Sequence, residues 1–324
     1  MVRISVVIPV FNRAEVLSAT LEHLCRQDYP PDAFEVVVAD DGSTEPVGQV
    51  VDGFRSRLPV RHVRQENGGR AAACNLGARH ARYEVLLFLD CDIWAAPDTL
   101  SLHARHHESG DRVGVVTLSR HHPGTRVNPF MEVKGLFPDL TPRQPRDLSP
   151  LHAIMQCFSV RARDFWTVGG FDEGFRTYGW EDFELAVRLR ASGVRLKLEP
   201  RPRVWHYHVE TLDSARAKQR QAGTGAVYFW RRHGCPWGLG FFLELHPLLL
   251  PLKWLVYRTP LFVPAFRHLV RLAQRRLEAA RGWRRRAWLL VAHECYVELL
   301  WHAYYEGVWE ALRAGRPVPA QARS

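Results

Sequence analysis

A continuous apolar run that ends in two acidic residues constrains the fold of this chain more than any other feature of its sequence. Residues 85–89 have the sequence VLLFL, and Asp90, Cys91 and Asp92 follow them. A strand without polar alternation is predicted to be covered on both faces, as in the parallel sheet of an α/β domain. Because ligands of such sheets bind at the carboxyl ends of the strands, we expect Asp90 and Asp92 to lie at a ligand site.

The composition is typical of a globular chain in a reducing compartment. With 324 residues, 46% of them hydrophobic and 24% charged, the chain can form one large domain with an extension, or two domains. Its six cysteines form no CxxC pair, which favours a cytoplasmic location over a disulfide-bonded one. A predicted strand begins at residue 4 and leaves no room for a signal peptide. The net charge of +10 by itself indicates no particular partner.

Two regions of different pattern divide the chain. Up to about residue 210, short apolar runs alternate with segments of helical period, which predicts a βαβ-type sheet. The predicted strands cover residues 4–10, 34–39, 60–64, 84–89, 113–118 and 203–209. Asn12 is expected to cap the first helix. The proline-rich residues 119–150 are predicted to form a long loop over the active edge of the sheet. The helical, basic pattern that follows predicts domains at 1–212 and 213–324.

The first two predicted strands end in polar residues. PVFNR ends the first, and ADDGS ends the second, with Asp40 and Asp41 at its close. Such residues are common in plain turns, and ADDGS alone is most often one. The functional alternative is that Asp40 or Asp41 accepts a hydrogen bond from a ribose or a base N–H, while Phe11 packs near the base.

A Gly-Gly turn opens a predicted helix of small residues in QENGGRAAACNLGARHA, residues 65–81. Small side chains allow a helix to lie close to a sheet. The helix N-terminus and Arg70 together offer backbone N–H groups and a cation to a pyrophosphate. The segment lacks the GxGxxG pattern of dinucleotide-binding proteins, so hydride transfer is not supported.

The DCD sequence and a downstream histidine pair suggest a cation site. In an extended strand end, Asp90 and Asp92 point the same way and can both reach a divalent cation. In RVWHYHVET, residues 203–211, His206 and His208 share one face of a predicted strand. Either histidine could complete a carboxylate and imidazole site for Mn²⁺ or Mg²⁺, although a core histidine is the ordinary alternative.

Two acidic residues begin a predicted helix over residues 182–191. Glu181 and Asp182 at this position are favoured by capping and by the helix dipole, which lowers the pKa of a carboxyl group. The neighbouring aromatic residues Tyr178, Trp180 and Phe183 act in the opposite direction, because burial raises that pKa. The sequence leaves both possibilities open.

Taken together and in order, these motifs resemble family 2 glycosyltransferases of the GT-A fold. The motifs are PVFNR, ADDGS, ENGGR, LDCD, GGFDEGF and GWEDFELAVRLRASG, and they extend over residues 4 to about 208. The resemblance implies an α/β fold with a Rossmann-like mixed, mostly parallel sheet flanked by helices, here followed by a C-terminal helical extension. It also implies transfer of a sugar from a nucleotide diphosphate, of the UDP, GDP or dTDP type, to an acceptor hydroxyl, usually with inversion.

The resemblance also suggests a role for each motif residue. Asp182 is the expected catalytic base, with Glu181 beside it. The residues expected at the nucleotide sugar are Pro9, Phe11, Asn12, Asp40, Asp41, Gly69, Arg70 and Asp90. The expected metal ligands for Mn²⁺ or Mg²⁺ are Asp90, Asp92, His206 and His208. Tyr178, Gly179 and Trp180 are expected to bind the acceptor.

The chain departs from processive polysaccharide synthases of the same superfamily. Residues 218–232 do not match the Gln-x-x-Arg-Trp motif of those enzymes, so transfer of single sugars is expected. Two other functions agree less well with the sequence. A sugar nucleotidyltransferase would need a glycine-rich signature after the first strand, which PVFNR lacks. A catalytically silent nucleotide-binding scaffold would not need the intact DCD, GWED and histidine residues.

The C-terminal region has a basic and apolar pattern. Residues 237–257 are too interrupted by polar residues and prolines to span a membrane, but could enter its interface. Residues 266–286 form a basic amphipathic pattern that suits anionic lipid headgroups or, alternatively, a solvated helix. Nucleic acid is not expected, and Val297 breaks the HExxH pattern of a metalloprotease. We therefore expect a cytoplasmic enzyme, with an anionic membrane surface and a lipid-linked acceptor as candidate partners.

Overall fold

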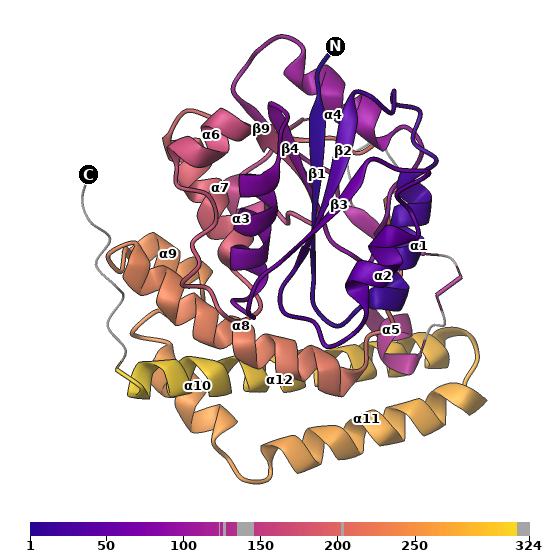
Figure 1. Cartoon of the computed structure of the whole chain (residues 1–324). Helices are drawn as coiled ribbons and strands as arrows, with labels where there is room; N and C mark the ends of the chain where they lie inside the picture. Colours follow the sequence, from indigo (N-terminus) through magenta and orange to yellow (C-terminus); the bar gives the residue numbers. More distant parts are fainter. Residues whose placement is uncertain (123, 126–127, 135–145, 202–203, 316–324) are drawn as a thin grey trace. The chain divides into compact units, whose positions relative to one another are not determined.

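The computed structural model forms two compact units (Figure 1). It describes all residues except 123, 126–127, 135–145, 202–203 and 316–324. The first unit comprises residues 1–125, 140–176 and 181–208, and the second comprises residues 126–139, 177–180 and 209–324.

A mixed, mostly parallel sheet is the centre of the first unit. Its strand order is β3-β2-β1-β4-β9-β6-β10-β8. The strands are β1 (Ile4–Val10), β2 (Phe34–Asp40), β3 (Val60–Arg64), β4 (Val85–Leu89), β6 (Val113–Val116), β8 (Arg146–Asp147), β9 (Cys157–Arg161) and β10 (Arg195–Leu198). Strands β1, β2 and β4 pair in parallel and are buried along their whole length. The continuously apolar runs therefore do mark the centre of the sheet.

Helices cover both faces of this sheet (Figure 1). They are α1 (Ala14–Leu24), α2 (Val47–Asp52), α3 (Arg70–His80), α4 (Thr99–His107), α6 (Ala162–Thr167) and α7 (Glu181–Ala191), with a 3₁₀ turn η1 (Pro150–His152). Helix α3 lies very close to β1, because a Cβ atom built on Gly77 would be only 2.4 Å from Cγ1 of Val7. This close approach confirms the interpretation of the small-residue helix.

The expected cap of α1 is wrong. Arg13, not Asn12, occupies the N-cap position, and Asn12 adopts a left-handed backbone conformation with φ of 50°. The side chain of Asn12 instead accepts hydrogen bonds from Thr44, at 2.8 Å from its backbone nitrogen. The carboxylate of Glu45 accepts the N–H of Ala14, at 2.7 Å, so the helix terminus is satisfied from a neighbouring loop.

A second, three-stranded sheet places the histidine segment. Its order is β5-β11-β7, formed by β5 (Ile93–Trp94), β11 (Val204–His206) and β7 (Ser119–His121). The strand expected over residues 203–209 is thus shorter, and it pairs outside the main sheet. In the antiparallel pair with β5, His206 is opposite Ile93. This register puts His206 next to the DCD segment.

The second unit is helical. It contains α5 (Pro129–Lys134), α8 (Leu212–Arg232), α9 (Trp237–Phe242), α10 (Leu250–Tyr257), α11 (Phe262–Ala279) and α12 (Gly282–Arg313). Helices α8 and α12 pack closely, since a Cβ atom on Gly223 would be 1.9 Å from the carbonyl oxygen of Tyr304. Within the described residues, no helix has the length and apolar character to cross a membrane.

The predicted loop over residues 119–150 is only partly described. Its described portions include β7, α5 and β8. Residues 123, 126–127 and 135–145 of this segment lie outside the described residues. Its expected role over the edge of the sheet therefore stays a prediction.

Candidate active site

Two loops at the carboxyl ends of β1 and β2 are bound to each other. The backbone N–H of Asn12 donates to Oγ of Ser43, at 2.9 Å, and the N–H of Asp41 donates to the carbonyl of Val10, also at 2.9 Å. Phe11 extends from this pair of loops with 47% of its surface exposed. Pro9, by contrast, is buried inside β1 and pairs with Ala39 of β2. Phe11 is thus the accessible aromatic residue of the PVFNR motif.

The two acidic residues of ADDGS are buried and hydrogen-bonded within the protein. Oδ1 of Asp40 accepts the N–H of Ser43 at 2.8 Å, and its Oδ2 lies 3.2 Å from Nε2 of His62. Burial opposes ionisation of Asp40, but the bonds from Ser43 and His62 outweigh it and lower the pKa of the carboxyl group. The turn interpretation therefore describes what Asp40 does in this structure.

Asp41 holds the Gly-Gly turn. Its Oδ1 accepts the N–H of Gly68 at 2.9 Å, and its Oδ2 accepts the N–H of Gly69 at 2.8 Å. Gly69 has φ of 92°, a conformation that strongly favours glycine. The sequence predicts that N–H groups at the N-terminus of this helix face a pyrophosphate, and the N–H groups of Gly68 and Gly69 directly precede that helix. Here they are occupied by Asp41 instead, and the turn is fixed as part of the first unit.

Arg70 brings together carboxylates from two separate motifs, LDCD and GWED. Its guanidinium donates to Oδ1 of Asp90 at 2.9 Å and to Oδ1 of Asp182 at 2.8 Å, and lies 3.4 Å from Oε1 of Glu181. It also donates to the carbonyl of Met155 at 3.1 Å. The end of β4 and the start of α7 therefore both contact the first residue of α3.

The carboxylates around Arg70 differ in their surroundings. Glu181 is buried, and its Oε2 atom has no hydrogen-bond partner among the described residues. Burial, with the charge of Asp182, raises the pKa of Glu181 to about 7. Burial also raises the pKa of Asp90 to about 6, against the opposing effect of Arg70. For Glu181 and Asp90, desolvation thus outweighs the effects that favour the charged form.

Asp182 is held in a fixed orientation at the N-terminus of α7. Besides the bond from Arg70, its Oδ2 accepts the backbone N–H of Met155 at 2.9 Å. Its side chain keeps 14% of its surface exposed, twice the value for Glu181. A carboxylate can accept about four hydrogen bonds, so Asp182 retains sites that can accept a proton.

Asp92 faces a different set of partners from Asp90. Its Oδ2 lies 3.1 Å from Nε2 of His206 and 3.3 Å from Nη1 of Arg13. Burial disfavours its charge, but the hydrogen bond with His206 and the charge of Arg13 lower the pKa of Asp92 overall. The ring of His208 lies 5.5 Å from that of His206. His206 is thus in direct contact with Asp92.

The expectation that Asp90 and Asp92 point the same way is wrong. Strand β4 ends at Leu89, and the N–H of Ile93 donates to the carbonyl of Asp90 at 3.1 Å, which closes a turn over the DCD segment. The alternation of an extended strand therefore does not apply there. Asp90 turns towards Arg70, and Asp92 turns towards His206.

The residues present provide a partial ligand set for a divalent cation. Within the described part of the chain, no group of three or more His, Cys, Asp and Glu residues is arranged to hold a metal ion. Asp92 and His206 form a carboxylate and imidazole pair of the type that binds Mn²⁺. Mg²⁺ sites commonly combine one or two carboxylates with substrate phosphates, so a complete protein cage is not required. Asp92 and His206 therefore fit a cation whose remaining ligands would come from a diphosphate.

The segment expected to bind an acceptor belongs to the second unit. Tyr178 is exposed, and its N–H donates to Oε1 of Gln221 at 3.0 Å. Nε1 of Trp180 donates to the carbonyl of Ala222 at 2.7 Å. Gly179 and Trp180 both have positive φ, at 101° and 76°, and a bulky residue such as Trp180 is strained in that conformation. The strain lies directly before Glu181 in the chain.

Two contributors to the site were missed in the sequence. Arg13 is part of the PVFNR motif, but nothing in the pattern links it with Asp92. The backbone N–H of Met155 has no sequence signal at all, because any residue except proline supplies one. Both depend on which distant segments the sheet brings together.

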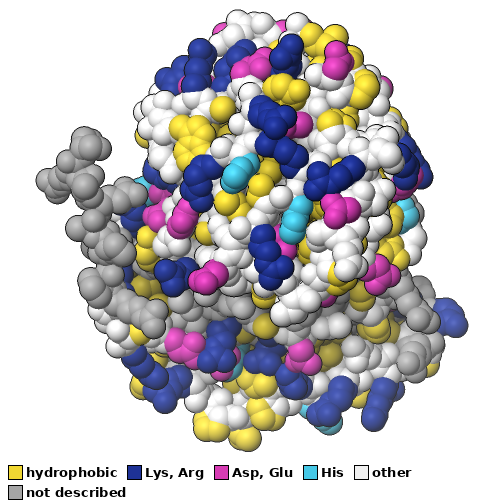
Figure 2. Space-filling model, viewed as in Figure 1, with side chains coloured by type: hydrophobic (Ala, Val, Ile, Leu, Met, Phe, Trp, Pro, Cys, Tyr) yellow, Lys and Arg dark blue, Asp and Glu magenta, His cyan; other side chains and the backbone are white. Residues whose placement is uncertain are grey.

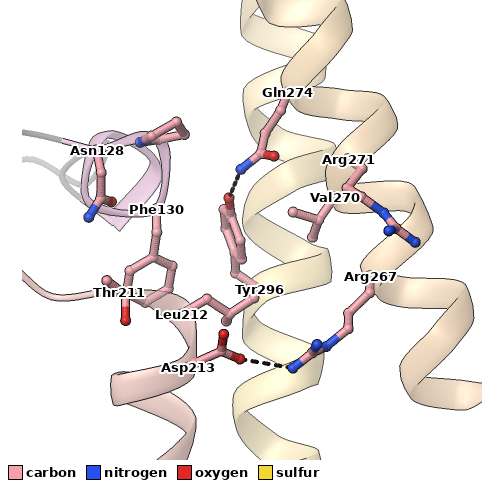
Figure 3. A pocket seen from close by; sticks show the side chains of 11 residues that line it. Asn128, Phe130, Thr211, Leu212, Asp213, Arg267, Val270, Arg271, Gln274 and Tyr296 are labelled. Atoms are coloured by element: carbon pink, nitrogen blue, oxygen red, sulfur yellow. Dashed lines mark hydrogen bonds and ion pairs between the residues drawn. The ribbon is translucent and has the colours of Figure 1, made fainter.

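A pocket of about 380 Å³ lies within the second unit, among residues of α5, α8, α11 and α12. Figure 3 shows two of its polar contacts: Arg267 donates to Asp213 at 2.8 Å, and Gln274 donates to the hydroxyl of Tyr296 at 2.8 Å. Four of the polar side chains that line the pocket, those of Arg267, Asp213, Gln274 and Tyr296, are therefore already paired. Its lining residues are different from those predicted for the donor, the metal and the acceptor.

The fold and the grouping of acidic residues at the strand ends define a GT-A type transferase architecture. The family model described as "Glycosyl transferase family 2" matches residues 5–169, and the model for the "N-terminal domain of galactosyltransferase" matches residues 156–210. The chain therefore belongs to glycosyl transferase family 2. The family and the fold class expected from the motifs are both confirmed.

Similar proteins include the validoxylamine A glucosyltransferase of Streptomyces hygroscopicus subsp. limoneus, which is 33% identical over 290 residues. That match covers 80% of this chain and 60% of the relative, so the chain spans less than two thirds of the relative's length. Among solved structures, the mannosyltransferase PcManGT from Pyrobaculum calidifontis, in complex with GDP-Man and Mn²⁺, matches with a TM-score of 0.60 and 19% identity over 95% of this chain and 88% of that one. TarS residues 1–349 of S. aureus, in complex with UDP-GlcNAc, match with a TM-score of 0.55 and 19% identity over 97% and 92%. These structural matches establish the fold.

Proposed function

We propose that this protein is a metal-dependent, inverting glycosyltransferase that moves one sugar from a nucleotide diphosphate to an acceptor hydroxyl. The observation that carries this proposal is the convergence of Asp90, Glu181 and Asp182 on Arg70. Carboxylates from separate motifs meet where ligands of α/β sheets bind, which a turn or a helix cap alone does not require. Family membership gives this arrangement its chemical meaning.

Asp182 is the proposed catalytic base. An acceptor hydroxyl must lose its proton as its oxygen attacks the sugar, and a base positioned for this step contributes about 10²- to 10⁴-fold. The bonds from Arg70 and Met155 fix the orientation of Asp182, and its partial exposure leaves it accessible to an acceptor. Glu181 is nearly buried, so we propose that it affects the reaction through its charge state beside Asp182 and not by direct proton transfer.

Asp92 and His206 are the proposed protein ligands of Mn²⁺ or Mg²⁺. When bound, such a cation neutralises the negative charge that develops on the departing nucleotide diphosphate. The direct contact between Asp92 and His206 favours this pair over one that includes His208. Asp90, which pairs with Arg70, is proposed to act toward the sugar and ribose instead.

The loops at the ends of β1 and β2 are the proposed nucleotide site. Phe11 has the exposure needed to pack on a base. Internal hydrogen bonds of Asp40, Asp41 and Gly69 shape these loops. A direct contact of Asp41 with ribose therefore requires that Asp41 release part of the Gly-Gly turn.

The proposed acceptor-binding segment comprises Tyr178, Gly179 and Trp180. A lipid-linked acceptor and a peripheral location on the inner face of a membrane extend this proposal.

Calorimetric titration with UDP, GDP, dTDP and CDP, each with and without Mn²⁺, tests the donor site. We expect one nucleotide to bind tightly and to weaken strongly without the metal. Metal-independent binding would contradict the role of Asp92 and His206. Binding without any sugar transfer or hydrolysis would support the scaffold function, and no binding of any nucleotide would contradict the proposal as a whole.

A further inference from the structure

Large apolar side chains are exposed over a short stretch of the second unit. Between residues 241 and 261, Phe241, Leu248, Leu252, Leu255 and Leu261 have exposed fractions of 65%, 76%, 58%, 65% and 73%. Trp254 and Val256 in the same stretch are more than two fifths exposed. Exposed apolar residues scattered singly need no explanation, but a cluster on one short segment usually marks a binding surface.

Helix α10 is attached to its unit by one side only. Tyr257 is its buried residue, and the hydroxyl of Tyr257 donates to Glu298 of α12 at 2.9 Å. Leu252 and Leu255 are three residues apart in α10, a spacing that places their side chains on one helical face, and the exposed Leu248 precedes the helix. This leucine face is exposed along its length, so it contributes little to holding the unit together.

The stretch and the helix that follows it carry a net positive charge. Residues 241–277 contain one lysine, five arginines and one acidic residue, Glu244, whereas the whole chain has 34 acidic residues in 324. Arg271 and Arg275 of α11 are exposed and have no ion-pair partner within the described residues. Figure 2 shows hydrophobic side chains at the lower edge of the view, with Lys and Arg side chains beside them. The surface is therefore apolar and cationic at once.

We propose that this surface docks on the headgroups of an anionic lipid bilayer. Helices with an apolar face and basic flanks lie in the plane of the interface, where the apolar side chains enter the bilayer and the cations meet lipid phosphates. Arg258 lies over the ring of Trp254, with its Cζ atom 5.0 Å from the ring centroid. Such a pair suits the interface between lipid headgroups and hydrocarbon, where tryptophan is enriched. A second copy of the chain is a poorer partner, because a symmetric contact would set two cationic surfaces against each other.

The role of this surface, to bring a transferase to a lipid-linked acceptor, rests on the proposed function. Vesicle binding itself needs no nucleotide. The two ideas can therefore fail separately: nucleotide titration reports on the donor site, and vesicle binding reports on the surface of residues 241–277.

Flotation of the full chain with lipid vesicles tests the surface. We expect binding to phosphatidylcholine vesicles that contain phosphatidylglycerol, weaker binding to pure phosphatidylcholine, and loss of binding at high salt. The double variant Leu252→Ser/Leu255→Ser and the charge reversal Arg271→Glu/Arg275→Glu should each reduce the partition coefficient at least about tenfold. All four side chains are exposed, so both variants should fold.

Matched controls make the outcome decisive. Trp166→Ser removes an exposed aromatic residue from α6 of the first unit and should leave vesicle binding unchanged. The proposal is overturned if the wild-type chain does not float with anionic vesicles, or if both double variants float as well as it does. It is also overturned if sedimentation shows a dimer that Leu252→Ser/Leu255→Ser disrupts while vesicles are not bound.

Discussion

Nη1 of Arg70 lies 2.8 Å from Oδ1 of Asp182, across 112 positions of sequence. The contact joins the first turn of α3 to the first turn of α7, two helices that begin at the carboxyl edge of the sheet. Because Arg70 also holds Asp90, one side chain sets the positions of the carboxylates for which we propose different roles. The chemistry of this site is therefore best tested by changing one carboxylate at a time.

Asp182→Asn should reduce sugar transfer by about 10²- to 10⁴-fold, the usual contribution of a general base. Asparagine is nearly isosteric and keeps an oxygen that can accept from Arg70 or Met155, so nucleotide affinity should stay within a few-fold of the wild type. Initial rates and calorimetric affinities measured on the same preparation separate the two effects. Asp111→Asn, an exposed carboxylate that pairs with Arg195, is the matched control. Loss of nucleotide binding together with activity would mean that Asp182 is structural.

Glu181→Gln should change how stability depends on pH. The pKa of Glu181 is raised to about 7, first by burial and then by the charge of Asp182, from a usual value near 4.5. A carboxyl group with a raised pKa costs no stability below its unfolded pKa, but the folded state loses stability as pH rises from about 4.5 through 7. Glutamine carries no such cost. The variant should therefore be more stable than the wild type at pH 8, by roughly 1–3 kcal/mol.

Urea unfolding of both proteins across this pH range measures the effect. At about pH 4 the two proteins should be nearly equal in stability, which provides an internal control. A constant difference at every pH would show that Glu181 acts by packing or hydrogen bonding alone, and not through its ionisation.

The sequence predicted the parts of this structure that depend on local pattern. Strands β1, β2, β3, β4 and β6 and helix α7 were found, because their apolar residues form continuous or periodic runs. Strand β9 was missed, since it gains its stability from pairing antiparallel with β4 and β6, which are distant in sequence. Pairing between distant strands leaves no signal in either one.

The same distinction applies to the candidate site. The sequence predicts Asp90, Asp92 and Asp182 as site residues, because they follow a buried strand or begin a helix. Their partners were not predictable: the turn at Ile93 that separates Asp90 from Asp92, and the register that puts His206 opposite Ile93, are tertiary features. The pKa of Glu181 likewise depends on the burial that the folded chain creates.

His206→Ala should weaken metal-dependent nucleotide binding more than His208→Ala does. His206 lies 3.1 Å from the carboxylate of Asp92 and has a larger effect than His208 on the pKa of that carboxyl group. Even residues that merely orient a metal ligand cost about 10- to 100-fold when removed, so loss of His206 should cost at least tenfold in Mn²⁺-dependent affinity.

Titration of the best nucleotide with Mn²⁺ and with EDTA measures this difference. In EDTA the wild type and both histidine variants should bind with similar, weaker affinity. If His208→Ala has the larger effect in Mn²⁺, then the ligand is His208 and the contact between His206 and Asp92 is an ordinary hydrogen bond.

Gly77→Ala should destabilise the first unit, although alanine is the better helix former. An added Cβ would lie 2.4 Å from Cγ1 of Val7 and 3.3 Å from Cβ of Ala39, and both of these neighbours are fully buried in the sheet. Forcing an extra carbon into such a core costs about 1–3 kcal/mol, and the gain in helix propensity offsets up to about 1 kcal/mol of that. Gly53→Ala is the control, because its nearest neighbour would be at 3.4 Å and its φ of −63° suits alanine. Its stability should be unchanged or slightly higher.

The double variant Gly77→Ala/Val7→Ala tests the cause of this loss. It removes the methyl group of Val7 that the new Cβ would meet, so its loss of stability should be smaller than the sum of the losses in the two single variants. Additive losses would mean that α3 does not press on β1 at Val7, and the close approach that places Arg70 beside Asp90 would then need another cause.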